Sequence, residues 1–409
     1  MNTPKSGHST PIKSRLRICF AGGGSGGHIN AGIAIAEALI ADRSVDLLFL
    51  TSAREIDSKI TSLFAGSLPA SSVCHQIALP LRTSLPLPAN TGRTWFSPSA
   101  VLQAGKWTVS LLNSFRIAVR ALKRHQPEMI VGLGGFASLP TVAAASLLGI
   151  PVYLLEQNSV PGKANRICSR WAAEMWTGWT IDPAWSQTIR CPQKQTGIPL
   201  RQGFTCLQSR RKEKPAHTRT ATRILITGGS LGARRLNELS LNALQQIRLP
   251  DHRVHVIHQT GNQWSAGDAN TRISDSVDYL ALPFLNNPAQ EMADCDLVIC
   301  RAGSMTLAEI AWIGIPAIIV PLGQSADLHQ QANARAYQNE FEAVVIDEHS
   351  PEAAGQIVRL ILAFAESGHL MDTGCPRSHS VGTNSDRTPF NNAAQRIASL
   401  IIAAAETAD

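Results

Sequence analysis

Short runs of apolar residues alternate along the chain with longer stretches rich in alanine and leucine, in which apolar positions recur with helical spacing. The short runs predict buried strands, and the longer stretches predict helices that cover a sheet. Because strands and helices alternate, we expect the sheet to be parallel. The strands are expected at residues 17–21, 46–51, 129–132 and 151–155, and again at residues 223–227, 254–259, 278–281, 296–300 and 316–321.

The second half of the chain repeats the opening of the first. Residues 17–26 read as a strand that runs into a glycine-rich turn and then an apolar helix, and residues 223–232 do the same. This echo predicts an α/β protein with two Rossmann-like, doubly wound domains that face each other across a cleft, with ligands at the carboxyl ends of their strands. The expected organisation is a flexible tail at 1–16, a first domain at 17–204, a linker or loop at 205–222, a second domain at 223–388 with a flexible insertion at 366–389, and a terminal helix at 390–409.

Length and composition agree with two globular domains. The chain has 409 residues, of which 44% are hydrophobic and 16% are charged; this is enough apolar content for packed cores and too little charge for a disordered or coiled-coil chain. The formal net charge of +7 suits anionic partners, namely phosphorylated substrates, acidic lipid surfaces or nucleic acid, and does not choose among them. The eight cysteines are scattered and form no Cys-x-x-Cys pair, which favours buried, reduced thiols in a cytosolic protein.

Neither the N-terminus nor the longest uncharged segment has the pattern of a membrane-directed sequence. Residues 1–17 are polar and basic, and no apolar stretch that resembles a signal peptide accompanies them. Residues 129–155 carry no charge, but glycines and prolines divide them into a strand, a loop, a short helix and a second strand. We therefore expect neither export nor a membrane-spanning helix.

A run of glycines follows the first predicted strand and opens a helix. Residues 22–28 read Gly-Gly-Gly-Ser-Gly-Gly-His, and glycines at such a turn let backbone N–H groups approach an anion at the positive end of a helix. Three of these glycines also satisfy the G-x-G-x-x-G pattern of dinucleotide-binding proteins. However, Thr51 and Ser52 stand where a nicotinamide or flavin site needs an acid, at the end of the second strand. The loop therefore favours phosphate binding over a dinucleotide site.

Residues 228–232 form the second glycine turn. Their sequence, Gly-Gly-Ser-Leu-Gly, matches the G-x-S-x-G elbow of serine hydrolases, for which Asp327 and His349 would supply the remaining chain order. A hydrolase needs only one such turn and leaves the first glycine loop unexplained. Phosphate contact through the Ser230 hydroxyl and the neighbouring amides is the better-supported interpretation.

Two polar segments follow strands of the second half. After the strand at 296–300, Ser304 is expected to cap a helix, and the Glu309 carboxylate could accept two hydrogen bonds from a vicinal diol such as ribose. The alternative is a solvated helix glutamate, although its apolar neighbours argue for a partly buried carboxylate that needs a partner. After the strand at 316–321, residues 323–333 gather amide and hydroxyl groups that suit a sugar.

The sequence predicts neither a metal nor a cofactor. Asp294-Cys295-Asp296 resembles the D-x-D of metal-dependent glycosyltransferases, but it falls between a helix end and a strand start, at the amino-terminal edge of the sheet. No His or Cys cluster has zinc spacing, and there is no G-x-x-x-x-G-K-[ST] loop.

Residues 81–125 mix basic side chains with aromatic and leucine side chains. They could form a surface that touches anionic lipid headgroups. They could equally form an ordinary amphipathic helix whose apolar face packs in the core. The pattern leaves both interpretations open.

Six motifs, taken together, resemble one family closely, and they follow its order over residues 16–345. The motifs are GGSGGH at 23–28, GLGGF at 132–136, EQN at 156–158, PGKANR at 161–166, GGSLGA at 228–233 and TLAE at 306–309. They are similar to those of the MurG family of peptidoglycan glycosyltransferases. These enzymes move N-acetylglucosamine from UDP to undecaprenyl-diphosphate-linked N-acetylmuramyl pentapeptide, which converts lipid I to lipid II.

The resemblance implies an inverting glycosyltransferase of the GT-B type, with the acceptor in a membrane-facing first domain and the nucleotide sugar mainly in the second. It implies a peripheral protein at the cytoplasmic face of the bacterial inner membrane, with UDP-N-acetylglucosamine and lipid I as substrates, an anionic membrane surface as a partner and no nucleic acid. Glu309 would hold the ribose diol, Ser230 the diphosphate, and Asn158 and Gln330 the sugar. The implied donor site comprises Ser25, Gly26, Gly27, Asn158, Arg201, Ser230, Leu285, Ser304, Met305, Thr306, Leu307, Ala308, Glu309 and Gln330.

His28 is the candidate general base. The muramyl 4-hydroxyl must lose a proton as it attacks the anomeric carbon, and an imidazole with a near-neutral unperturbed pKa beside the acceptor suits that transfer. His28 could instead only bind phosphate. Helix N-termini and backbone amides can stabilise the departing UDP without a metal.

Three departures from the family pattern affect the expected loop geometry rather than the expected reaction. Ala31 replaces a usual proline, Ile198 replaces an asparagine, and the segment at 323–326 is one residue longer than in some relatives. Two other functions stay open at this point. One is a GT-B transferase with a different glycolipid acceptor, and the other is a nonenzymatic nucleotide-sugar or dinucleotide-binding protein.

Overall fold

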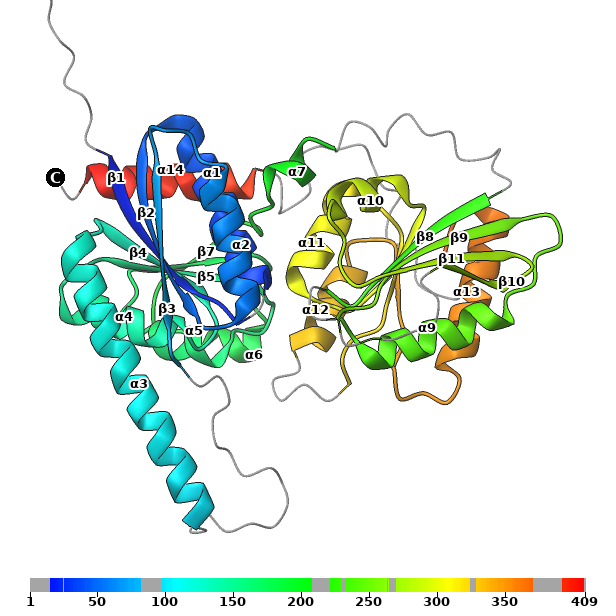
Figure 1. Cartoon of the computed structure of the whole chain (residues 1–409), viewed down its shortest axis with the longest axis horizontal. Helices are drawn as coiled ribbons and strands as arrows, with labels where there is room; N and C mark the ends of the chain where they lie inside the picture. Colours follow the sequence, from blue (N-terminus) through cyan, green and yellow to red (C-terminus); the bar gives the residue numbers. More distant parts are fainter. Residues whose placement is uncertain are drawn as a thin grey trace, which may run out of the picture.

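The chain forms two α/β domains that lie side by side (Figure 1). The first is drawn in blue to green and the second in lime to orange, and the terminal helix α14 (Ala393–Glu406), drawn in red, returns to the first domain, where it packs against α1 (Gly26–Asp42). The computed structural model describes residues 15–24, 26–81, 98–207, 221–229, 232–262, 264, 270–323, 329–370 and 392–407.

The first domain contains a parallel sheet with the strand order β3-β2-β1-β4-β5-β6-β7 among its described residues. Its central strands are buried on both faces, which explains why they read as continuous apolar runs in the sequence. The strands are β1 (Leu16–Gly22), β2 (Val45–Ser52), β3 (Val73–Leu79), β4 (Met129–Gly134), β5 (Val152–Glu156), β6 (Glu174–Thr177) and β7 (Gln193–Gln195). The helices are α1, α2 (Glu55–Gly66), α3 (Pro98–His125), α4 (Ser138–Leu147), α5 (Lys163–Cys168), α6 (Pro183–Ser186) and α7 (Gln202–Thr205).

The second domain repeats this arrangement with the strand order β10-β11-β9-β8-β12-β13-β14 in the described part of the chain. The edge strand β10 pairs antiparallel with β11, and the other pairs are parallel. The strands are β8 (Ala221–Thr227), β9 (Arg253–Gln259), β10 (Asn270–Ser274), β11 (Val277–Leu282), β12 (Leu297–Cys300), β13 (Ala317–Ile319) and β14 (Ala343–Val345). The helices are α9 (Arg234–Gln246), α10 (Pro288–Asp294), α11 (Ser304–Ile313), α12 (His329–Gln338) and α13 (Ala353–Ser367).

The two doubly wound domains confirm the predicted fold class, and all nine expected strands are present with small shifts at their ends. Five further strands, β3, β6, β7, β10 and β14, were not among those expected. β7 consists of three exposed polar residues, and its sequence therefore carries no strand pattern.

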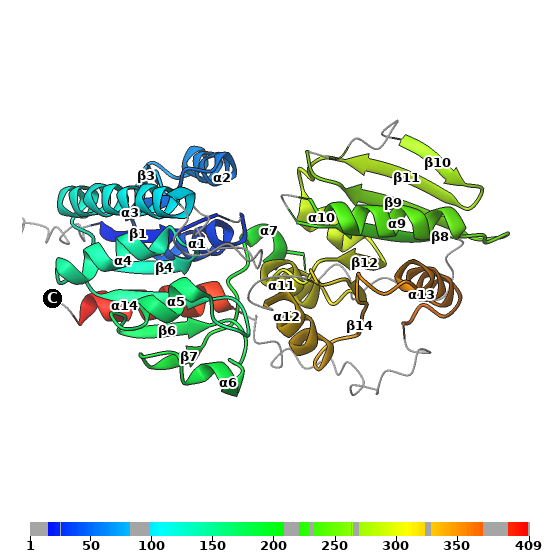
Figure 2. The ribbon, with the colours of Figure 1, turned by 90° about the horizontal axis from the view of Figure 1, so that it is seen from below.

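The domains meet across a packed boundary. The Trp312 indole N–H in α11 donates to the carbonyl of Phe204 in α7 at 3.1 Å, and the buried rings of Trp179 and Tyr337 pack edge to face at 6.5 Å. Figure 2 shows α11 and α12 on the side of the second domain that faces the first. These contacts bring the carboxyl edge of the first sheet close to α11 and α12.

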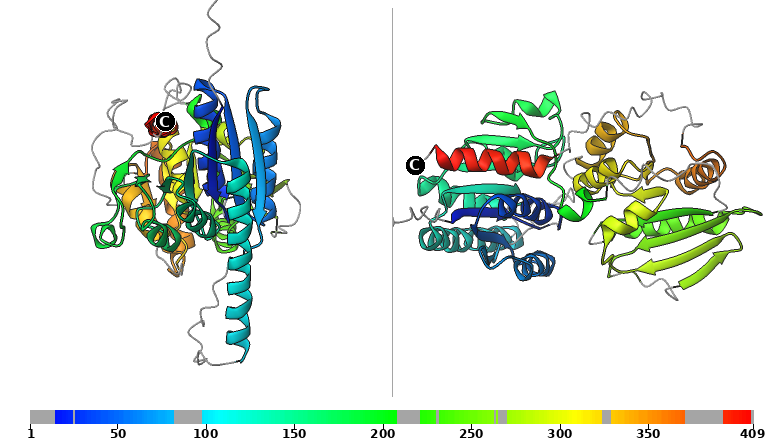
Figure 3. Two further views of the ribbon diagram at one scale, coloured as in Figure 1. Left: turned by 90° about the vertical axis from the view of Figure 1, so that its left-hand side faces the viewer. Right: turned by 90° about the horizontal axis from the view of Figure 1, so that it is seen from above.

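Helix α3 extends well beyond the body of the first domain (Figure 3). Ser114, Ala118 and Leu122 in its second half are buried against the domain, whereas Val109 and Leu112 near its middle are 68% and 52% exposed. Arg82, Arg93, Trp95 and Phe96, which contributed to the predicted basic and aromatic surface, lie outside the described residues. None of the described helices combines the length and the apolar character that crossing a bilayer requires.

The segments expected to lie between or beyond the domains are described only in part. Thr205 forms the end of α7, Ala221 begins β8, and residues 208–220 between them lie outside the described part of the chain. Glu366 belongs to α13, whereas residues 371–389 of the expected insertion are not described. The described cysteines carry free thiols. They are buried or half-buried except for the exposed Cys206.

Candidate active site

A buried carboxylate holds the first glycine turn, between β1 and α1. Asp57 lies in the first turn of α2, and its Oδ2 atom accepts hydrogen bonds from the Gly24 N–H at 2.8 Å and from the Ser52 hydroxyl at 2.5 Å. Gly23 has a φ of +142°, and a side chain there would collide with Asp57. Asp57 is not among the predicted site residues, because nothing in its spacing from Gly24 indicates this contact.

His28 follows Gly26 and Gly27 in the first turn of α1. Its Nδ1 atom lies 3.5 Å from the amide nitrogen of Gln157, and its ring also hydrogen-bonds to the backbone of Leu133. Burial lowers the pKa of His28 and outweighs the nearby Glu156 and Asp57 carboxylates, which raise it. The imidazole is therefore neutral at neutral pH, which is the form that a general base requires.

The loop after β5 is organised by Glu156. This buried carboxylate accepts four hydrogen bonds: from the Asn158 N–H and side-chain amide, each at 3.0 Å, and from the Gly162 N–H and the Asn165 amide, each at 2.9 Å. Each carboxylate oxygen thus has two donors, and the loop is fixed from within. Asn158, one of the predicted donor-site residues, is held in place by this loop.

Asn333 of α12 joins this loop to the second domain. Its amide nitrogen donates to Asn158 Oδ1 at 3.0 Å and to the carbonyl of Ala302 at 3.3 Å, and its Oδ1 accepts from the Ser159 N–H at 3.1 Å. His329, also in α12, has its Nδ1 atom 2.9 Å from the Val160 carbonyl and lies close enough to His28 to influence its pKa. The structure thus brings His28, Asn158 and the start of α12 together.

Glu309 lies in α11, buried against the domain boundary. Burial raises its pKa from 4.5 to about 7, and the nearby Arg201 guanidinium has the opposite effect. Arg201 comes from the first domain, directly before α7, and packs over the ring of Phe204 at 5.9 Å. Two predicted donor-site residues from different domains therefore interact electrostatically.

The expected cap of α11 was wrong. Ser304 is the first helical residue, and Gly303 occupies the N-cap position with an extended backbone and no side-chain hydrogen bond. A glycine cap leaves the first amides of the helix without a side-chain acceptor.

The other predicted residues of α11 differ in accessibility. Ser304 and Thr306 are half-buried, and Met305 is almost fully buried. Leu307 and Ala308 are completely buried. Leu285, in the loop before α10, is nearly so. Leu307 and Ala308 therefore expose neither side chain nor backbone to solvent, whereas Ser304 and Thr306 are accessible in part.

The second glycine turn follows β8. The Gly229 N–H donates to Thr227 Oγ1 at 3.1 Å, and Gly232 has a φ of +73° and approaches the backbone of Thr260 so closely that a side chain would not fit. Ser25 and Ser230, the hydroxyl residues predicted for the two glycine turns, lie outside the described residues.

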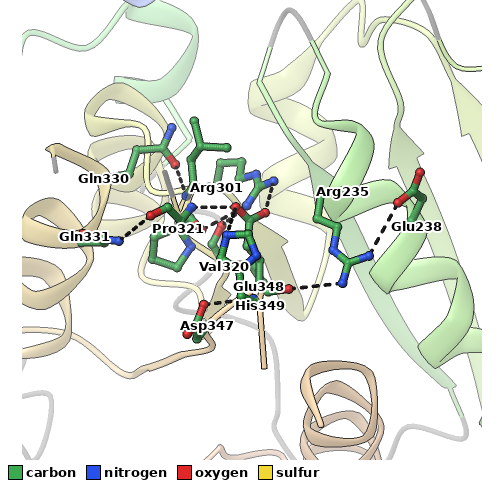
Figure 4. Close-up of polar contacts among 12 residues, drawn as sticks. Arg235, Glu238, Arg301, Val320, Pro321, Gln330, Gln331, Asp347, Glu348 and His349 are labelled. Atoms are coloured by element: carbon green, nitrogen blue, oxygen red, sulfur yellow. Dashed lines mark hydrogen bonds and ion pairs between the residues drawn. The ribbon is translucent and has the colours of Figure 1, made fainter. Parts of the chain in front are cut away.

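The loops after β12, β13 and β14 are linked by polar side chains (Figure 4). Arg301 and Glu348 form a buried ion pair at 2.7 Å, and Gln330 of α12 accepts the Leu322 N–H at 3.0 Å. Arg301 and Glu348 were not predicted, because each is a single charged residue without a spacing that marks a site. Among the described residues, no three His, Cys, Asp or Glu side chains are grouped so that they could hold a metal ion.

Comparisons with known proteins match both domains. Residues 18–177 match the N-terminal domain of glycosyltransferase family 28, and residues 223–368 match its C-terminal domain. The UDP-N-acetylglucosamine--N-acetylmuramyl-(pentapeptide) pyrophosphoryl-undecaprenol N-acetylglucosamine transferase of Acidovorax sp. (strain JS42) is 34% identical over 331 residues, which is 81% of this chain and 75% of the relative. The transferase of the same name from Polaromonas naphthalenivorans (strain CJ2) is 35% identical over 79% of this chain and 82% of its own.

A solved structure supports the same architecture. The crystal structure of Acinetobacter baumannii MurG superimposes with a TM-score of 0.61 and 24% identity, covering 95% of this chain and 99% of the other. At this identity the likeness establishes the two-domain fold.

Proposed function

The chain belongs to glycosyltransferase family 28 and, within it, to the MurG family, and from this premise we propose that it transfers N-acetylglucosamine from UDP to undecaprenyl-diphosphate-linked N-acetylmuramyl pentapeptide. The acceptor oxygen is the 4-hydroxyl of the muramyl sugar. The products are UDP and lipid II, a precursor of peptidoglycan.

The junction between α1, the loop after β5 and α12 carries the proposal. His28 and Asn158 come from the first domain, Asn333 comes from the second, and the Asn158–Asn333 hydrogen bond joins them. A transferase must bring an acceptor hydroxyl against the anomeric carbon of a donor, and holding two reactants in this way removes much of the entropic barrier. A junction supplied by both domains suits a reaction between two separately bound substrates.

The second domain would bind most of the donor. The Glu309 carboxylate accepts hydrogen bonds from the two ribose hydroxyls, and the 228–232 turn receives the diphosphate at the positive end of α9. Asn158 and Gln330 bind hydroxyls of the transferred sugar. Arg201, close to Glu309, adds a positive charge on the side of the first domain.

The reaction is a single in-line displacement. The muramyl 4-oxygen forms a bond to the anomeric carbon while the bond from that carbon to the phosphate oxygen of UDP breaks, which inverts the configuration. His28 takes the proton of the attacking hydroxyl, and the backbone amides of the two glycine turns and the N-termini of α1 and α9 stabilise the charge on UDP. Each of these steps uses groups of the chain itself.

Helix α3 would place the first domain against the cytoplasmic face of the inner membrane. Val109 and Leu112 are exposed, and Lys106, Arg116 and Arg120 on the same helix are also exposed. Apolar side chains enter the boundary between headgroups and acyl chains, while basic ones contact anionic headgroups. This arrangement would bring the acceptor, which is anchored in the bilayer by its lipid, to the first domain.

The test is incubation with UDP-N-acetylglucosamine and a lipid I analogue. We expect release of UDP together with a disaccharide product. An otherwise identical analogue without the muramyl 4-hydroxyl is the control and should give neither. Absence of acceptor-dependent UDP release from folded protein would refute the proposed function.

A further inference from the structure

A buried ion pair lies at the carboxyl edge of the second sheet (Figure 4). Arg301 follows β12 and Glu348 follows β14, and Arg301 Nη2 lies 2.7 Å from Glu348 Oε2. The two side chains are only 7% and 4% exposed. Because a buried charge without a partner is strongly destabilising, each residue holds the other in place.

The ion pair is hydrogen-bonded to the turn that follows β13. Arg301 Nη1 donates to the carbonyls of Val320 at 2.9 Å and Pro321 at 3.1 Å. Glu348 Oε1 accepts a hydrogen bond from the Gly323 N–H at 2.6 Å. The two charged side chains therefore hold the turn at both of its ends.

The same turn is attached to the start of α12. The Leu322 N–H donates to Gln330 Oε1 at 3.0 Å, and the Gln331 amide donates to the Gly323 carbonyl at 3.2 Å. Gln330 is one of the residues that bind the transferred sugar in the proposed function. Its position thus depends on the turn that the ion pair fixes.

Arg301 is also connected to the second glycine turn. Its backbone N–H donates to the Thr227 carbonyl at 3.3 Å, and the Thr227 hydroxyl accepts from the Gly229 N–H at 3.1 Å. Arg235, in the first turn of α9, reaches the Glu348 carbonyl at 3.5 Å. One cluster thus links the turn proposed for the diphosphate to the helix proposed for the sugar.

We propose that Glu348 is a positioning residue for the nucleotide-sugar donor. Through its contacts with Arg301 and Gly323 it fixes the position of the turn at 320–323. That turn then fixes the position of Gln330 relative to the second glycine turn. The inference rests on the proposed function, because the donor is the ligand whose binding it improves.

The variant Glu348→Gln tests this role. Glutamine keeps the size of the side chain and an acceptor for the Gly323 N–H but loses the charge that pairs with Arg301. We expect the donor KM and the calorimetric Kd for UDP-N-acetylglucosamine to rise on the order of 10-fold, because small displacements of binding groups have large effects. The acceptor KM and kcat should stay close to wild type.

Glu352→Gln is the matched control. Glu352 lies four positions further along, is 73% exposed in its side chain, and pairs loosely with Arg359 at 3.9 Å. The Glu352→Gln substitution should change neither the donor KM nor the donor Kd. If Glu348→Gln does not fold, Arg301→Lys replaces it, since lysine keeps the buried positive charge but cannot reproduce the fork that contacts Val320, Pro321 and Glu348.

The outcomes separate the two proposals. A folded Glu348→Gln protein with a lower melting temperature and an unchanged donor KM would overturn the positioning role and leave only a structural one. The same result for folded Arg301→Lys would also overturn it. Wild-type protein that binds the donor but forms no disaccharide would refute the proposed function and leave the positioning role standing. That role is measured by the donor Kd of the variant relative to the donor Kd of wild type, which requires no turnover.

Discussion

Replacing Glu309 with glutamine should weaken donor binding while stabilising the free protein at alkaline pH. Glu309 is 8% exposed in α11, and its burial raises the pKa of the carboxyl to about 7 from 4.5. The ionised form that ribose binding requires is therefore disfavoured by the fold itself. Glutamine has nearly the same shape and carries no charge at any pH.

The size of the stability effect follows from this shift in pKa. A difference of about 2.5 pKa units corresponds to about 3 kcal/mol. The pKa of Glu309 is higher in the folded than in the unfolded protein. Its contribution to the free energy of unfolding is therefore fully present below pH 4.5, where the carboxyl is protonated in both states, and is lost as the pH rises to about 7. The glutamine variant avoids this loss, so its advantage should grow between these pH values and remain constant above them.

Donor binding, unlike stability, should be weakened by the substitution. If only the ionised Glu309 accepts both ribose hydroxyls, the wild-type donor KM should rise as the pH falls below about 7 and be on the order of 10-fold higher at pH 6 than at high pH. The glutamine variant should show a donor KM raised on the order of 10-fold at pH 8 and nearly independent of pH, because one hydrogen bond to a charged acceptor is worth roughly 1.5–3 kcal/mol.

Two measurements check this prediction. Thermal unfolding of both proteins is followed at pH 5 and pH 8, and donor KM is measured between pH 6 and pH 8 by UDP release, with Glu352→Gln as the exposed control. Equal melting temperatures of wild type and variant at pH 8 would contradict the effect of burial. Unchanged donor kinetics would remove Glu309 from the ribose site.

Three further predictions concern the junction and the membrane surface. His28→Ala should lower kcat on the order of 100-fold with little change in donor KM; near-normal turnover would remove His28 from the catalytic step. Asn333→Ala should lower the free energy of unfolding by about 1–3 kcal/mol, because it leaves buried partners unpaired, and should raise the donor KM, as denaturant titration and kinetics will show; unchanged values of both would contradict its bridging role. Val109→Glu with Leu112→Glu should reduce sedimentation with anionic vesicles, whereas Leu63→Glu, at a leucine of α2 that is as exposed as Val109, should not; equal losses would point to a general effect of added charge.

The fold was predictable where each element carries its own signal. β1 and β8 are apolar runs that end in glycine turns, and the local pattern identifies both without any tertiary information. β7 is polar and exposed, so that only its pairing with β6 makes it a strand. The cap of α11 was mispredicted because Ser304 is a preferred capping residue, whereas the backbone places Gly303 at that position.

The site was predictable only to the extent that motifs mark it. Asn158 and Glu309 stand in recognisable motifs. The contact between Asn158 and Asn333 joins residues 175 positions apart and depends on how the two domains pack. Glu348 is a lone acid after a short strand, and its role depends on Arg301 reaching it from another loop. Such pairings are properties of tertiary structure that no local pattern contains.

In the part of the chain that the structure describes, four buried carboxylates lie at the carboxyl edges of the two sheets or close to them, and their hydrogen-bond partners distinguish one from the other three. Asp57, Glu156 and Glu348 each accept hydrogen bonds from backbone N–H groups of the turns that they hold. Glu309 receives no such hydrogen bond from the described residues, and burial raises its pKa to about 7. Since a buried carboxylate is costly unless donors satisfy it, the three paired carboxylates stabilise the turns, and Glu309 is the one that gains most from a ligand. A vicinal diol supplies two donors at once, which is why the ribose assignment predicts that donor binding lowers the pKa of Glu309.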